Sequence, residues 1–331
     1  MNRPKCTEFD YINFLIAAQK VFTCTEAARC QPDAPEPPAH DAFTRLLTRQ
    51  PPDTEALWQE AEAMVDRRKG LLVNDDTTLD KPYARKMELV TRHWSGKHRR
   101  VVQGINLTTL LWTDGEALIP TDFRLYDKAN DGQTKNDHFR AMLRRAHERG
   151  FSPRYVAFDG WYSSLANLKQ VRSLGWHWLT RLKQNRLVNP DNTGNIPLNT
   201  VEIPSEGRVV HLKGYGMIRV FRIVATDGDT EYWATDDLDM DEASRKELGR
   251  QAWGIETYHR AIKQHSGIER CQVRSARGQR VHILFSLRAF LRLEAFRQRT
   301  AVSWQDAKLG ILREAMRAYL ANPTILLEPT A

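Results

Sequence analysis

Acidic residues at three separate places in this chain could together hold divalent metal ions. Asp75 and Asp76 close the apolar run "LLVNDD", and Asp159 closes "YVAFD". Glu256 stands in the basic stretch "WGIETYHRAIKQ". Carboxylate oxygens are the ligands that Mg²⁺ and Mn²⁺ prefer. Two such ions can activate a water or a 3′-hydroxyl and stabilise the leaving oxygen of a phosphodiester. The set therefore predicts metal-dependent phosphodiester chemistry.

Each acidic position also has an ordinary structural explanation. The Asp-Asp-Thr-Thr run is good turn chemistry, and Glu256 could make a surface ion pair on an amphipathic helix. Two acids at the ends of two buried strands are harder to explain separately. Ligands of α/β sheets bind just beyond the strand ends. We therefore expect Asp159 and one acid of the Asp75–Asp76 pair to meet at one sheet edge, with Glu256 delivered by a helix.

The strands and helices that must position these acids are predicted from Gly70 onward. Strands are predicted for "LLVNDD", "RVVQGINLTTLLW" and "ALIPTDFRLYD", the last two joined by an Asp-Gly turn. Helices and strands then alternate through "DHFRAMLRRAHERG", "PRYVAFD", "SLANLKQVRSLG" and "WHWLTRL". Turn residues and short strands between about 185 and 229 predict a β-rich insertion. The expected fold class is α/β, a mixed sheet flanked by helices.

The ends of the chain are predicted to be helical. Residues 1–66 contain three apolar-periodic stretches, interrupted by the proline-rich "QPDAPEPPAHD". Arg45 and Arg49 on the third stretch are compatible with a helix-turn-helix that reads DNA, and a plain helical cap on the next domain is an equal alternative. We expect a catalytic domain over 67–300 and a C-terminal helical segment over 301–331.

Composition is that of a globular protein, with 41% hydrophobic and 27% charged residues among 331. No apolar run approaches the roughly 20 residues that a membrane span needs, so we expect no membrane partner. The first residues lack the pattern of a secretory signal. The four cysteines show no metal-binding spacing, which favours free thiols in the cytoplasm.

Positive charge is concentrated in two blocks of the chain. The formal net charge is +8. Residues 81–100 carry seven Lys or Arg against one acid, and residues 251–300 carry ten against three. Such blocks favour contacts with phosphates of a nucleic acid, although they could serve solubility alone. Aromatic side chains such as Trp161 and Trp233 could stack on unpaired bases, but core packing is the favoured explanation for both.

The helix predicted around Glu256 would join the acid to bases. His259, Arg260 and Lys263 follow Glu256 by three, four and seven residues, so all four share one helix face. A metal held by the carboxylate and a phosphate held by the bases would lie side by side there. This arrangement explains an acid in a basic neighbourhood.

The acids, in this order and on these elements, resemble the DDE transposases of bacterial insertion sequences, which have a ribonuclease H-like catalytic core. The resemblance covers Gly70 to Arg299 and is narrower for the subgroup with a β-rich insertion and a Tyr-x2-Arg-x3-Glu-x6-Lys signature. It implies Asp76 as the first catalytic and metal-binding acid, or Asp75 because the pair leaves the register open by one. Asp159 and Glu256 would be the second and third.

The resemblance also implies partners and an activity. The protein would cleave double-stranded DNA at terminal inverted repeats, using Mg²⁺ or Mn²⁺ and two ions, and transfer the 3′-hydroxyl into target DNA. It would act as a homodimer on paired ends, in the bacterial cytoplasm with the nucleoid. Gly249 and Ala252 stand where the signature has Tyr and Arg. The expected DNA-binding residues are Lys263, Arg260, His259, Arg250, Lys97, Arg99, Arg100, Arg274, Arg277, Arg45 and Arg49.

Two other functions remain open at this point. A ribonuclease H-like nuclease or resolvase would share the metal chemistry but would not transfer strands. A DNA-binding regulator would use the basic blocks without chemistry, and it would leave the three acids without a common purpose. A glycosidase with paired carboxylates would favour an acidic cleft, which the basic blocks argue against.

Overall fold

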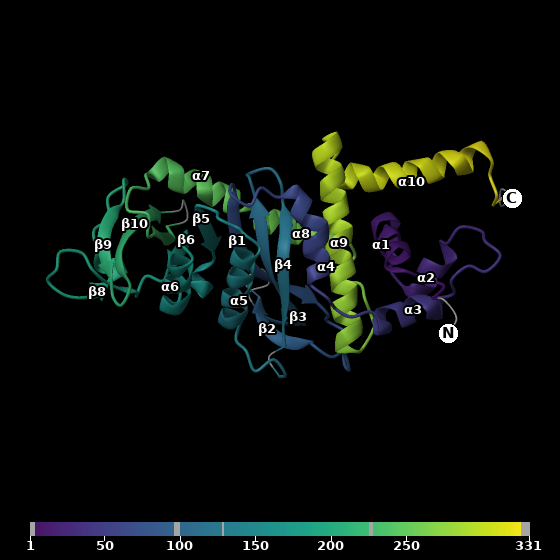
Figure 1. Cartoon of the computed structure of the whole chain (residues 1–331), viewed down its shortest axis with the longest axis horizontal. Coiled ribbons are helices and arrows are strands. Elements are labelled where there is room, and N and C mark those ends of the chain that lie inside the picture. Colours follow the sequence, from purple (N-terminus) through teal and green to yellow (C-terminus); the bar gives the residue numbers. More distant parts are fainter. Residues whose placement is uncertain (1–3, 96–99, 128, 225–227, 326–331) are drawn as a thin grey trace. The chain divides into compact units, whose positions relative to one another are not determined.

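The computed structural model describes residues 4–95, 100–127, 129–224 and 228–325 (Figure 1). The chain forms two compact units. The helical unit comprises Met1–Asp53, Arg85–Glu88 and Arg260–Ala331, and the sheet unit comprises Thr54–Ala84 and Leu89–His259.

The sheet unit is built on one mixed sheet, which has eleven strands within the described residues. Its order is β2-β3-β1-β5-β6-β11-β10-β9-β7-β8, and β4 pairs with β3. The first six strands are β1 (Leu71–Asp80), β2 (Thr91–Ser95), β3 (Arg100–Thr113), β4 (Ile119–Tyr126), β5 (Tyr155–Phe158) and β6 (His177–Leu182).

The pairing directions define a ribonuclease H-like α/β fold. Strands β1, β3 and β4 are antiparallel neighbours, whereas β5 pairs parallel to β1 and β6 parallel to β5. The apolar residues of β1 and β5 are fully buried, as expected for central strands covered on both faces. The predicted fold class is confirmed.

The predicted β-rich insertion extends this sheet. Strand β11 (Thr230–Thr235) pairs antiparallel with β6, and β10 (Gly216–Val224) pairs antiparallel with β11. The sheet then continues through β9 (Arg208–Leu212), β7 (Leu187–Asn189) and β8 (Ile196–Pro197). The insertion therefore lengthens the sheet at one edge.

Helices pack on the sheet of this unit. The sheet unit contains α4 (Glu55–Ala61), η1 (Glu62–Met64), α5 (Lys135–Glu148), η2 (Gly160–Tyr162), α6 (Leu165–Ser173), η3 (Leu198–Thr200) and α7 (Glu242–Ala252). Helix α5 begins at a Thr134–Asp137 capping box and packs on β3 and β4. Helix α6 packs beside α5 and on β6 (Figure 1). Helix α7 packs on β1 and β5.

The helical unit gathers both ends of the chain around one long helix, α9 (Ala276–Thr300). Residues 281–291 of α9 are buried on every side, because α1 (Glu8–Ala17), α3 (His40–Arg49) and α10 (Trp304–Ala321) pack against it. Helix α2 (Cys24–Arg29) packs on α3. Among the described residues, no helix combines the length and apolar character that a membrane span requires.

The two units divide the chain differently from the three expected segments. Helix α4 lies within residues 1–66 but packs on β4 through Leu57, Trp58 and Ala61, all buried, and so belongs to the sheet unit. The residues after His259 belong with the N-terminal helices. The reason is that α9 supplies the apolar surface on which α1 and α3 pack, so neither terminal segment stands alone.

Lys308 of α10 is expected to stabilise the helical unit. Its ammonium is buried and donates to the carbonyls of Leu15, Ile16 and Ala18 at 3.2, 2.6 and 2.8 Å. These carbonyls end α1 and have no partner further along the helix. We expect Lys308→Met to lower the free energy of unfolding by about 2 kcal/mol, because the buried carbonyls lose their donor. Urea unfolding should show this loss, and the exposed Arg313→Met on the same helix should change little.

Candidate active site

Asp75 and Asp76 lie on opposite faces of the sheet. In the antiparallel pairing of β1 with β3, Asp75 stands opposite Thr109 and Asp76 opposite Thr108. Successive side chains of a strand point to opposite faces, and directly paired residues share a face. Only one of the two acids can therefore share a face with Glu256, and the groups packed on each face identify which.

Asp76 faces helix α5 and the turn that contains η2. Its carboxylate accepts hydrogen bonds from Asn106 Nδ2 at 2.6 Å, Lys135 Nζ at 2.8 Å and Tyr162 OH at 2.9 Å. Burial alone would raise its pKa, but the Lys135 charge and these three donors together bring the pKa of Asp76 below its ordinary value. The Asp76 charge is thus neutralised by a lysine of the same unit.

Asp75 faces helix α8 (Gly254–His265). Tyr258 of that helix is buried beside Thr109, and His259 Nδ1 lies 3.9 Å from Asp75 Oδ2. Burial raises the pKa of Asp75 well above its ordinary value, and the neighbouring charges of Asp76, Glu256 and Asp159 raise it further. Asp75 is therefore the member of the pair that lies within the electrostatic reach of the other two candidate acids.

The register between β1 and β5 places Asp159 beside Asp75. The parallel pairing of β1 and β5 sets Phe158 opposite Asn74, so the next residues are Asp159 and Asp75. The Asp159 side chain is 43% exposed, and its Oδ1 accepts from Arg181 Nη2 at 2.9 Å. Arg181 also pairs with Glu231 at 2.6 Å. The Asp159 carboxylate is therefore accessible to solvent but is paired with the Arg181 guanidinium.

Glu256 lies in the first turn of α8 and is exposed. The adjacent Ile255 and Tyr258 are buried. The helix therefore packs through its apolar side and leaves the Glu256 carboxylate toward solvent, where it still acts on the charge of Asp75.

The three carboxylates suit a divalent metal in type but are not yet arranged around one position. In the part of the chain that the structure describes, no three His, Cys, Asp or Glu side chains are close enough to hold a metal ion. The buried Asp75 charge is nevertheless repelled by Glu256 and Asp159, and a hard cation would relieve this repulsion. Metal binding would require Asp159 to exchange Arg181 for the ion.

The expected DNA contacts of the sheet unit have different surroundings. His259 is only 4% exposed, so in this conformation it contacts Asp75 and offers little surface to DNA. Arg250 is exposed and donates two hydrogen bonds to Glu247, at 2.8 and 2.6 Å. Arg100 is exposed at the start of β3. Lys97 and Arg99 fall outside the described residues.

The expected DNA contacts of the helical unit are mostly at its surface. Arg260, Arg274, Arg277, Arg45 and Arg49 are exposed. Arg45 pairs with Asp41 at 2.8 Å, and Arg49 donates to the Cys6 carbonyl. Arg277 donates to the carbonyls of Arg49 and Gln50, at 2.9 and 3.2 Å. The half-buried Lys263 lies 3.5 Å from Glu269.

Sequence reasoning missed the groups that bind the two aspartates. Lys135 and Tyr162 lie 59 and 86 residues from Asp76, and no spacing in the sequence indicates those contacts. Arg181 was in principle detectable. It follows Thr180, which pairs with Phe158 on the neighbouring parallel strand, so a base beside Asp159 follows from correct strand alignment.

Comparison with known proteins identifies the family of this chain. Residues 66–291 match the family model described as "Transposase DDE domain", and the chain belongs to that family. The cryo-EM structure of a piggyBac transposase synaptic complex with hairpin DNA is similar at a TM-score of 0.53 and 10% identity, covering 98% of this chain and 74% of that one. The Drosophila P element transposase strand transfer complex matches at a TM-score of 0.31 and 9% identity, over 99% and 76% of the two chains. None of the curated protein sequences matches this chain.

Proposed function

We propose that the protein is the transposase of a bacterial insertion sequence. It would cleave double-stranded DNA at the terminal inverted repeats of the element and join the freed 3′-hydroxyl to target DNA. The supporting observation is the register of β1 and β5, which sets Asp159 beside Asp75 in a chain of the Transposase DDE domain family. Asp75 lies on the face of the sheet toward helix α8, which carries Glu256.

In this proposal the first acid is Asp75, the alternative that the resemblance left open beside Asp76. Asp75 shares its face of the sheet with the helix that carries Glu256. Asp76 points to the other face, where Lys135, Asn106 and Tyr162 already occupy its oxygens. A carboxylate with those partners would have to give up an ion pair and two hydrogen bonds to bind a metal.

Asp75, Asp159 and Glu256 would hold two Mg²⁺ ions, with Mn²⁺ as a substitute. Members of the family generally use divalent metals. Bound ions would activate the attacking oxygen and stabilise the leaving one. The chain's own groups have separate roles: Arg181 holds Asp159 at 2.9 Å until it is displaced, and the Lys135–Asp76 pair fixes β1 against α5.

The exposed arginines Arg100, Arg250, Arg260, Arg274, Arg277, Arg45 and Arg49 are proposed to contact DNA phosphates, as are Lys97, Arg99 and Lys263. His259 would join them only if its buried side chain became exposed. We also propose a homodimer on paired ends, acting on nucleoid DNA in the cytoplasm. Leu312, Met316 and Leu320 of α10 support self-association, because these exposed apolar side chains recur every four residues along one helix face.

The test of the metal site is cleavage of DNA that carries the element's ends, taken from the sequence flanking the gene. We expect Mg²⁺-dependent nicking by the wild type and its loss in Asp159→Asn, with DNA binding largely retained. Asp191→Asn, in an exposed loop of the insertion, is the matched control and should cleave normally. Wild-type nicking by Asp159→Asn would refute the assignment.

A second assay separates transposition from simple hydrolysis. Pre-cut ends with a free 3′-hydroxyl are mixed with plasmid target in Mg²⁺. Joined products support the proposal. Nicking of end DNA without any joining would instead assign a ribonuclease H-like nuclease or resolvase, which shares the acids but does not transfer strands.

A further inference from the structure

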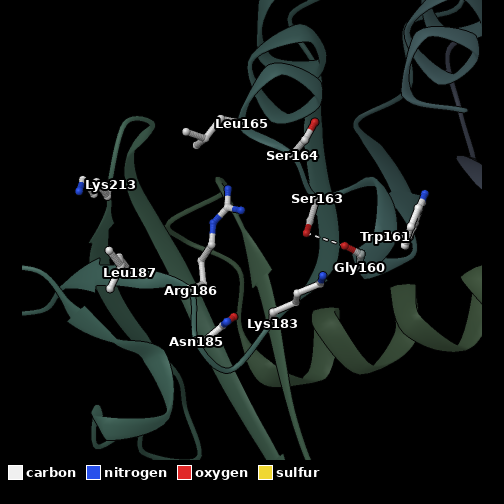
Figure 2. Close-up of a pocket in the computed structure, with 10 residues that line it drawn as sticks. All are labelled: Gly160, Trp161, Ser163, Ser164, Leu165, Lys183, Asn185, Arg186, Leu187 and Lys213. Carbon is white, nitrogen blue, oxygen red and sulfur yellow. Dashed lines mark hydrogen bonds between the residues drawn. The ribbon is translucent and has the colours of Figure 1, made fainter. Parts of the chain in front are cut away.

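A basic pocket of about 390 Å³ lies directly beside the second acid of the sheet unit (Figure 2). Gly160, the residue after Asp159, forms part of its wall. The segments that contribute are η2 with the serine after it, the start of α6, the connection from β6 to β7 and the turn between β9 and β10. The polar and aromatic residues among its lining are Trp161, Ser163, Ser164, Lys183, Asn185, Arg186 and Lys213.

The lining of the pocket is positively charged and contains no carboxylate. Lys183, Arg186 and Lys213 supply three cations from two segments, and every described residue of the wall other than these is neutral. Each of the two lysines is exposed and can reach an anion from the pocket rim. Such an arrangement attracts an anion and is unfavourable to a cation.

Arg186 has a buried guanidinium nitrogen that lacks a hydrogen-bond acceptor among the described residues. In Figure 2 its guanidinium points toward Leu165, at the start of α6. Its Nη2 atom is buried, and no acceptor for it exists among the described residues. Burial also lowers the pKa of Arg186. A buried guanidinium nitrogen without an acceptor is unfavourable, and a phosphate group can satisfy it with paired hydrogen bonds.

Two neutral features of the wall also favour an anion of this kind. Ser164 is the N-cap of α6, so the positive end of a nine-residue helix dipole adjoins the pocket. Trp161 is 62% exposed and lies at the end of the pocket near Gly160, away from Lys213 (Figure 2). An exposed aromatic ring beside a phosphate site suits a nucleotide better than a small inorganic ion.

We infer that this pocket binds a backbone phosphate of the DNA strand that passes the Asp159 rim, with Arg186 and Lys213 as its principal contacts. The inference rests on the proposed function, since it takes DNA as the substrate. It adds a specific phosphate contact beside Asp159, which the β-rich insertion and the loop after Asp159 would make.

The experiment measures the dissociation constant for a short DNA duplex as a function of salt, without divalent metal. The log–log slope falls by about 0.9 for each phosphate contact that is lost. We expect Arg186→Gln and Lys213→Gln each to reduce the slope by about one such step, with weaker binding at low salt. Lys169→Gln removes an exposed charge from α6 outside the pocket and should leave the slope unchanged.

The outcomes separate the pocket from the catalytic proposal. Unchanged slopes in both variants, with circular dichroism showing folded protein, would overturn the inference. Stabilisation of the wild type by inorganic phosphate with no change in the DNA slopes would also overturn it, since the pocket would then take a free anion. Reduced slopes in a protein that cleaves no DNA would support the pocket and refute the transposase proposal. Metal-dependent cleavage with unchanged slopes would support the transposase proposal and overturn the inference about the pocket.

Discussion

Asp75→Asn is expected to slow DNA cleavage by about a thousandfold or more and, at the same time, to raise the melting temperature of the metal-free protein. The rate loss follows because a metal-bound carboxylate accounts for several kcal/mol of transition-state stabilisation, and each ~1.4 kcal/mol is a factor of ten. The stability gain follows because the variant removes a buried charge that Asp76, Glu256 and Asp159 repel.

The pH dependence of this stability gain has a definite sign. The pKa of Asp75 in the folded protein lies well above 3.8, its value in an unfolded chain. Its favourable contribution is therefore complete below pH 3.8 and is lost as the pH rises through the folded pKa. The Asn variant has no such loss, so its advantage over the wild type should grow with pH. Thermal melts across this range in EDTA measure the difference.

Nicking by Asp75→Asn at the wild-type rate would exclude Asp75 from the metal site, whatever its stability. A second informative failure would be a lower melting temperature at every pH. That result would mean that a partner of the Asp75 carboxylate, such as His259 at 3.9 Å, stabilises the charge more than its acidic neighbours destabilise it.

Asp76→Ala is expected to have its main effect on stability, lowering the free energy of unfolding by about 3 kcal/mol. Both members of the Asp76–Lys135 pair are only 19% exposed, and removing one partner of such a pair leaves the other charge buried alone. Asn106 and Tyr162 also lose their acceptor. Chemical denaturation of the sheet unit within the full chain measures the loss.

The double variant Asp76→Ala, Lys135→Met provides the control. Its loss of unfolding free energy should be smaller than the sum of the two single losses, because it leaves no unpaired charge. Cleavage by folded Asp76→Ala is expected to persist. A variant that folds like the wild type but no longer cleaves would return Asp76 to the metal site and exclude the role proposed for Asp75.

The fold was predictable because local patterns decide most of it. The apolar runs before Asp75 and Asp159 are central strands, and the parallel register of β5 with β1 brings Asp159 beside Asp75. The expectation that both acids end their strands was wrong for Asp75, because β1 continues to Asp80 in its pairing with β3. The choice between Asp75 and Asp76 was not predictable. A shift of one residue exchanges the two faces of a strand, and only the partners on each face distinguish them.

The division of the chain and the basic pocket were also beyond local patterns. Residues 281–291 of α9 are buried, and helices from both ends of the chain pack against α9, which no periodicity within α9 reveals. The pocket around Arg186 is formed by four segments between Gly160 and Lys213. Its lysines are unremarkable in the sequence, and only their positions around one buried guanidinium nitrogen indicate a site.

Binding of Mn²⁺ tests most directly whether Asp75, Asp159 and Glu256 converge on one metal site. Electron paramagnetic resonance titration of the full-length protein counts bound ions without requiring DNA or activity. We predict binding by the wild type and by Asp76→Asn, and its loss in Asp75→Asn, Asp159→Asn and Glu256→Gln. Unchanged Mn²⁺ binding in Asp75→Asn, together with its loss in Asp76→Asn, would contradict this arrangement of the site.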